Sequence, residues 1–137
     1  MIEDNYVYLG FRGDFNLDDF VSRIGIQPTK RVEKKSIGPS SNFPKQSVLR
    51  YGQKHASQND SVADFYSLAD QVVDELAPFV EEIKQAIDEF EVDVTLQFVV
   101  WISTDEEKAT PVLGLSNRAI QFAGTLGASV DIDSYRG

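Results

Sequence analysis

Residues 61–90 read SVADFYSLADQVVDELAPFVEEIKQAIDEF, and this stretch decides the fold because its hydrophobic residues recur every three or four positions. That spacing places them along one stripe of an α-helix. Ser61, followed three residues later by Asp64, predicts where the helix begins. Pro78 interrupts the helix but leaves the phase of the stripe unchanged, so we expect a kinked helix or two helices that meet at Ala77 and Pro78. The stripe comprises Val62, Phe65, Ala69, Val72, Leu76, Phe79, Ile83, Ala86 and Phe90.

The rest of the chain supplies strands that this hydrophobic stripe can cover. Residues 92–103 give the clearest strand signal, because hydrophobic residues alternate along them. Asn16 predicts the cap of a short helix over 17–24, and a second short helix is expected over 117–126. The segment 28–44 is expected to be an irregular loop. The other predicted strands are 6–12, 46–51, 111–115 and 128–134.

Together these elements predict an α+β fold over a single domain, residues 1–137. We expect a mixed or antiparallel sheet of about five strands. The long kinked helix pair (61–90) and the two short helices are expected to pack on one face of that sheet. A chain of 137 residues is long enough to bury an ordinary hydrophobic core.

Charge is unevenly distributed along the chain, whose net charge is −9. Residues 1–56 hold nine Lys or Arg and six Asp or Glu, which gives +3, whereas residues 57–137 hold four and sixteen, which gives −12. The acidic part should repel polyanions, so nucleic-acid binding is not expected. The same charge would attract a basic protein partner, although it also serves solubility.

Composition excludes several other classes of protein. The absence of cysteine removes disulfides, thiolate catalysis and cysteine-ligated zinc. No hydrophobic run approaches the roughly 20 residues that a bilayer crossing requires, so no membrane association is expected. The opening Met-Ile-Glu-Asp-Asn lacks the basic start of a secretory signal, which favours a cytoplasmic location.

Two surfaces are candidates for binding a partner. On the side of the long helix opposite the hydrophobic stripe, acidic residues recur every seven positions, spaced by roughly 10 Å along the axis. Such a row could also be an ordinary solvent-exposed helix face with no partner. The second face of strand 92–103 turns hydrophobic towards its end, which predicts either burial or a contact patch. The residues are Asp74, Glu81 and Asp88, flanked by Asp70 and Glu82, on the helix, and Val99 and Trp101 on the strand.

Catalytic and metal-binding signals are weak. His55 is the only histidine, and catalytic or metal-binding histidines usually need a second imidazole or a thiol. Asp131 and Asp133 are two residues apart on a predicted strand and could seat Mg²⁺, which needs only one or two carboxylates and water. The polar side of an amphipathic strand explains them equally well. No cofactor is expected.

Several segments match a known pattern: FNLD at 15–18, GIQPT at 25–29, the long helix with its Pro78, the run 92–103, and LGASVDIDSY at 126–135. With these segments the chain resembles a bacterial family called domain of unknown function 4279. A departure occurs at 48–51, where this chain has VLRY and family members often carry a tryptophan. The resemblance implies an α+β fold, no established catalysis and genes found near polymorphic toxin systems, where small acidic cytosolic proteins serve as immunity proteins.

Our leading hypothesis from the sequence is a non-catalytic immunity-type protein that binds and neutralises a basic toxin domain. The proposed contacts are the acidic helix residues and Trp101. Two alternatives stay open. One is a small Mg²⁺-dependent hydrolase that uses Asp131 and Asp133, and the other is a homo-oligomeric interaction module that uses Val99 and Trp101.

Overall fold

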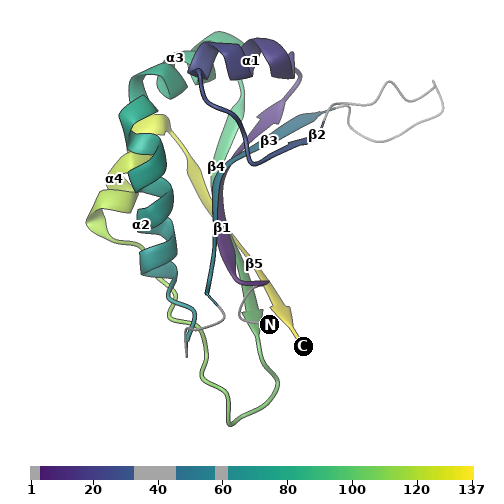
Figure 1. Ribbon diagram of the computed structural model, residues 1–137, viewed down its shortest axis with the longest axis vertical. Helices are drawn as coiled ribbons and strands as arrows, with labels where there is room; N and C mark the ends of the chain where they lie inside the picture. Colours follow the sequence, from purple (N-terminus) through teal and green to yellow (C-terminus); the bar gives the residue numbers. More distant parts are fainter. Residues whose placement is uncertain (1–3, 33–45, 58–61) are drawn as a thin grey trace, which may run out of the picture.

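A five-stranded mixed sheet carries the fold in the computed structural model, which describes residues 4–32, 46–57 and 62–137 (Figure 1). The strand order is β2-β3-β1-β4-β5, in which β5 runs parallel to β4 and every other neighbouring pair is antiparallel. The α+β class and the mixed sheet agree with the prediction. The strands are β1 (Tyr6–Gly13), β2 (Lys30–Val32), β3 (Ser47–His55), β4 (Asp93–Ile102) and β5 (Ser129–Arg136).

The long helical stretch is broken where the sequence predicts. Helix α2 (Phe65–Leu76) passes through a 3₁₀ turn, η2 (Ala77–Phe79), into α3 (Val80–Phe90). Pro78 lies in the first turn of η2, where its missing N–H costs no hydrogen bond. The side chain of Asp64 caps α2 by accepting hydrogen bonds from the N–H groups of Tyr66 and Ser67. The expected start at Ser61 lies outside the described residues.

The helices lie on one side of the sheet in Figure 1, and the hydrophobic core fills the space between these layers. Alternate residues of each strand face the helices, as the period of a strand requires. Phe98 on β4 stacks on Phe65 of α2, with ring centroids 5.6 Å apart. In the described part of the chain, no helix is long and apolar enough to cross a bilayer.

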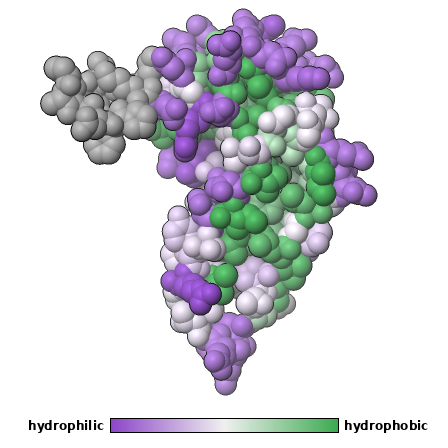
Figure 2. Space-filling model, turned by 180° about the vertical axis from the view of Figure 1, so that it is seen from behind, coloured by the Kyte–Doolittle hydropathy of each residue, from purple (hydrophilic) through white to green (hydrophobic). Residues whose placement is uncertain are grey.

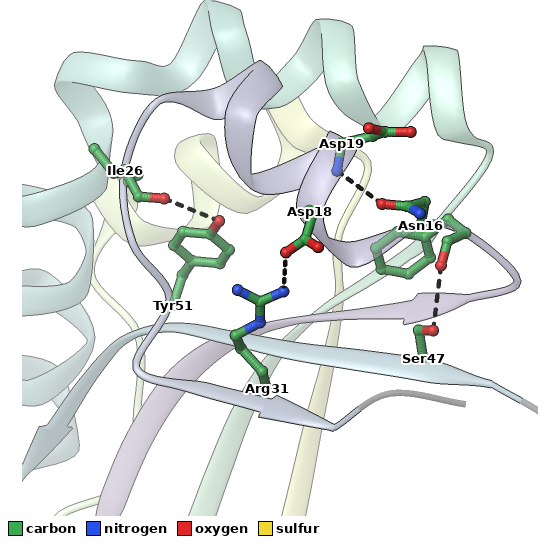
Figure 3. A network of polar contacts seen from close by, with 8 residues as sticks. Asn16, Asp18, Asp19, Ile26, Arg31, Ser47 and Tyr51 are labelled. Carbon is green, nitrogen blue, oxygen red and sulfur yellow. Dashed lines mark hydrogen bonds and ion pairs between the residues drawn. The ribbon is translucent and has the colours of Figure 1, made fainter. Parts of the chain in front are cut away.

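Helix α1 (Leu17–Ile24) has the limits that the sequence predicts, because both of its ends are capped. The Asn16 side-chain oxygen accepts a hydrogen bond from the N–H of Asp19 at 3.0 Å (Figure 3). Gly25 ends the helix with φ of 88°, a left-handed conformation that glycine adopts without strain. Helix α4 (Asn117–Leu126) likewise begins at a Ser116 cap and ends at Gly127.

Polar contacts tie α1 and the loop after it to the sheet (Figure 3). The hydroxyl of Tyr51 on β3 donates a hydrogen bond to the carbonyl of Ile26 at 3.1 Å. Ser47, at the start of β3, donates to the Phe15 carbonyl at 3.2 Å. On the surface, Arg31 of β2 forms an ion pair with Asp18 of α1. These contacts fix α1 over one end of the sheet.

Two elements differ from the prediction. The segment 28–44 was expected to be a loop, yet Lys30–Val32 pairs with β3 as a short edge strand; 33–45 lie outside the described residues. The expected strand 111–115 is wrong, because Val112 makes only a single bridge, to Asp64. Its backbone bonds the chain entering α2 instead of the sheet, with the Phe65 N–H donating to the Val112 carbonyl at 2.8 Å. The place beside β4 is taken by β5.

Tyr51 should make the stability of the fold sensitive to alkali. Burial raises the pKa of Tyr51 to about 12 from the ordinary 10.0, while Arg31 opposes the shift. Between these values the unfolded chain loses a proton that the folded chain keeps, so the free energy of unfolding falls as pH rises, by about 2–3 kcal/mol in total. Urea denaturation from pH 8 to 11 should show about half of this fall in the native protein, because the folded pKa lies above that range. The Tyr51→Phe variant should lose about 1 kcal/mol at neutral pH and show a shallower alkaline fall. Identical pH slopes for the two proteins would contradict the assignment.

Candidate functional site

Two of the five predicted acidic residues, Asp70 beside the row and Asp74 within it, hold α4 against α2. Asp70 accepts a hydrogen bond at 2.6 Å from the hydroxyl of Ser116, which also caps α4. Asp74, one turn further along α2, forms an ion pair with Arg118 of α4. Both side chains of that pair are exposed, so the pair contributes at most about 1 kcal/mol to stability. The sequence alone could not indicate these contacts, since the partners lie more than forty residues away.

The other three predicted acidic residues, Glu81, Glu82 and Asp88, are exposed on α3. After η2 the chain turns, and α3 packs beside α1 over the end of the sheet (Figure 1). The expected continuous acidic row is therefore divided into a pair that contacts α4 and a group on α3 that faces solvent.

The face of the sheet opposite the helices, here called the open face, carries Trp101. Leu96 and Phe98 point into the core, so Gln97, Val99 and Trp101 point the other way. The Trp101 ring stacks on Tyr135 of β5, with ring centroids 4.9 Å apart. The backbone N–H of Trp101 donates a hydrogen bond to the side-chain oxygen of Asn5 at 2.8 Å.

Aromatic rings extend across the open face beside Trp101. Val99 lies between Tyr6 of β1 and Asp133 of β5 in the strand register and is only 6% exposed. The Tyr6 ring lies near His55, with centroids 4.9 Å apart. The sequence contained a signal for the position of these rings. In strand 6–12, Tyr6 and Tyr8 alternate with core residues, so both must lie on the face of the sheet that points away from the core.

The other half of the open face is a polar hollow of about 710 Å³. Gly10 leaves room for the ring of Tyr8, because a Cβ there would lie 3.1 Å from that ring. The Arg50 guanidinium lies over that ring, 4.4 Å from its centroid, a cation–π contact. Burial raises the pKa of Tyr8, Arg50 opposes the shift, and Asp133 adds to it. The hollow is lined by Arg12, Arg50, Thr95, Gln97, Asp131 and Asp133, among others.

Charge on the open face therefore changes sign from one side to the other. Arg50 lies on β3 towards one side, and Asp131 and Asp133 lie on edge strand β5 at the other. Within the described ranges, no group of three or more His, Cys, Asp or Glu residues could hold a metal ion. The geometry adds nothing to the Mg²⁺ hypothesis for Asp131 and Asp133, both of which are exposed to solvent.

Exposed hydrophobic side chains gather on α4, on the segment before it and on β5. Figure 2, seen from behind the view of Figure 1, shows a hydrophobic area bordered by hydrophilic side chains. Contiguous exposed hydrophobic surface on a small protein often marks a contact site. Large hydrophobic residues that are about half exposed include Val112, Leu113, Ile120, Val130 and Ile132, which belong to the segment before α4, to α4 and to β5.

These features define a class of small α+β protein in which helices cover one face of a mixed sheet and leave an aromatic and charged face open. The chain belongs to the family described as Domain of unknown function (DUF4279), whose model matches residues 3–137. The match confirms the resemblance seen in the sequence. No curated protein and no solved structure matches the chain.

Proposed function

We propose that this protein is a non-catalytic, immunity-type protein that binds a basic toxin domain and blocks it through the open face of the sheet. The proposal rests on the kinds of side chain that lie on the open face. It combines Trp101 and Tyr135, stacked on each other, with Tyr6, Tyr8 and the aspartates of β5. Uncovered sheet faces are ordinarily polar, so this concentration of rings calls for a partner.

The chemistry of the open face is that of protein interfaces. Tyrosine, tryptophan and arginine supply most hot-spot residues, because their large side chains bury much area at little entropic cost. Here Arg50 is already held in place by Tyr8, and Trp101 by Tyr135, so little ordering entropy would be lost on binding. An exposed sheet face also supports an interface of ordinary size, about 800 Å² on each partner.

Acidic residues outside the open face have a secondary part in the proposal. Glu81, Glu82 and Asp88 would attract a basic domain over a distance and raise its association rate without forming the final contact. Asp70 and Asp74 would act indirectly, by holding α4 against α2. Trp101 is the predicted contact residue that lies on the open face itself.

Co-expression with a toxin-like gene, where one is encoded beside this one, tests the proposal. Growth should be restored in cells that make both proteins, and the two should elute as a complex in gel filtration. Restored growth without any complex would contradict direct neutralisation. Neither rescue nor complex would end the immunity hypothesis.

The exposed acidic group on α3 should affect the rate of association. In the Glu81→Lys/Glu82→Lys double variant, we expect association with the toxin domain to slow several-fold at low salt. The reason is that the variant weakens the electrostatic attraction between this protein and the basic domain. The dissociation rate should stay unchanged. Surface plasmon resonance at low and physiological salt measures both rates.

A matched control is Glu106→Lys/Glu107→Lys, which changes the net charge equally at exposed positions beyond the end of β4. Equal slowing by the two double variants would mean that only total charge matters. No slowing in either would remove α3 from the proposal.

A further inference from the structure

We propose that the outer edge of β5 accepts a β-strand from the basic partner, which extends the sheet by one strand; this inference rests on the proposed function and specifies how the partner docks. Strand β5 is the last in the sheet order, and all eight of its residues are exposed. Among the described residues, no strand pairs with its outer side. Its outward N–H and C=O groups can therefore bond an added strand.

Length distinguishes β5 from the other edge of the sheet. Strand β2, at that other edge, has three residues in the described part of the chain, and a short edge strand is a common way to keep an edge from pairing. Strand β5 runs from Ser129 to Arg136 and pairs with β4 along that whole length, so its backbone is held extended and ready to pair. Binding there would require little rearrangement.

The side chains of β5 specify what kind of strand would fit. On the helix side, Val130 and Ile132 continue the rows of Leu96 and Phe98, which are 0% and 1% exposed. Yet Val130 is 44% and Ile132 47% exposed, because the sheet ends there. Hydrophobic residues at alternate positions of an added strand would extend these rows and cover both side chains.

On the open face, Asp131 and Asp133 alternate with these two hydrophobic residues. Opposite charges on neighbouring strands are favourable, so the added strand should carry lysine or arginine at the positions that face the aspartates. The occupant is therefore a cationic amphipathic strand, in which basic and hydrophobic residues alternate. This pattern agrees with the acidic character of residues 57–137.

A second copy of this chain does not fit the same edge. A two-fold axis would pair β5 with itself in antiparallel fashion, and directly opposite residues then share a face. Pairing over residues 129–135 puts Asp131 opposite Asp133 of the second copy. Pairing over 130–136 puts Asp133 opposite itself. Like charges directly opposite each other are destabilising, so the aspartates protect the edge against self-association while leaving it open to a basic strand.

The test uses the full chain and a defined probe, an end-blocked peptide in which lysine and valine alternate over the length of β5. Amide hydrogen exchange should slow at 129–136 when the peptide is added, and a peptide with glutamate in place of lysine should have no effect. By fluorescence anisotropy, Asp131→Lys/Asp133→Lys should weaken lysine-peptide binding by about tenfold or more. Glu106→Lys/Glu107→Lys, with the same change in net charge, should bind within about twofold of the native chain.

Three results would overturn the inference. The first is no change in exchange at 129–136, or protection elsewhere only. The second is unchanged peptide affinity in Asp131→Lys/Asp133→Lys and in the milder Asp131→Asn/Asp133→Asn. The third is slower exchange in β5 as protein concentration rises without peptide, which would make a second copy the occupant.

The same variants separate this inference from the proposed function. If Asp131→Lys/Asp133→Lys neutralises and binds the toxin domain like the native chain, the strand-docking inference fails and the immunity function stands. If the peptide protects β5 but no toxin is bound or neutralised, the edge site stands and the immunity function fails.

Discussion

Phe98→Ala is expected to lower the free energy of unfolding by about 3–5 kcal/mol, the largest effect on stability that we predict for a single substitution. Phe98 is 1% exposed at the centre of β4, and its ring stacks on Phe65 of α2. Removing the ring loses its transfer free energy and leaves a cavity where the long helix meets the sheet. The surrounding residues cannot relax into this cavity without a further cost in free energy, because β4 is held between β1 and β5.

Urea denaturation followed by circular dichroism measures this loss. Ile120→Ala is the matched control: Ile120 is 53% exposed on α4, so its truncation should cost less than about 0.5 kcal/mol. If Phe98→Ala does not fold, Phe98→Leu keeps most of the volume and should cost about 1–2 kcal/mol. A loss below about 1 kcal/mol for Phe98→Ala would mean that α2 does not rest on β4 as described.

Trp101→Ala is expected to weaken the complex with the toxin domain by about 30-fold or more, which corresponds to about 2 kcal/mol. The indole lies on the open face and is fixed there by the stack on Tyr135. The hydrogen bond from the backbone N–H of Trp101 to the side chain of Asn5 holds this part of β4 in position. The substitution does not remove this bond, because it leaves the backbone unchanged. The lost affinity should appear mainly as faster dissociation, since the field that governs association is unchanged.

The control for this experiment is Tyr66→Ala, which removes an aromatic ring that is 43% exposed on α2, on the helix side. We expect its affinity to stay within about twofold of the native value. Trp101→Phe should recover part of the lost affinity, because it keeps a ring to stack on Tyr135. Native affinity in Trp101→Ala would place the interface elsewhere than the open face.

The helical half of the fold could be predicted closely because its signals are local. The three-to-four spacing, Asn16, Gly25 and Pro78 act through contacts within a turn or two, so α1, α4 and the break between α2 and α3 follow from the chain itself. The strand at 111–115 was predicted wrongly because a short hydrophobic run cannot indicate its pairing partner. That segment bonds the entry to α2, and β5 occupies the place beside β4.

The candidate site was predictable only in fragments. Alternation indicated that Val99 and Trp101 share a face, and a period of seven indicated an acidic row on the helix. Neither pattern could show that Asp74 would meet Arg118, or that Trp101 would stack on Tyr135. Those contacts join residues brought together by strand order, which depends on non-local pairing.

By itself, the sequence determined the class of fold, the helices and their ends, the alternating faces of the strands and the acidic character of the second part of the chain. These properties depend on backbone geometry and composition within a few residues. Only the tertiary structure decided that β5 would be an edge, that aromatic rings from three strands would meet on one open face, and that the acidic row would divide at η2. The physical reason is that hydrogen bonding between strands and the packing of helices on a sheet select among many arrangements that the same local patterns allow.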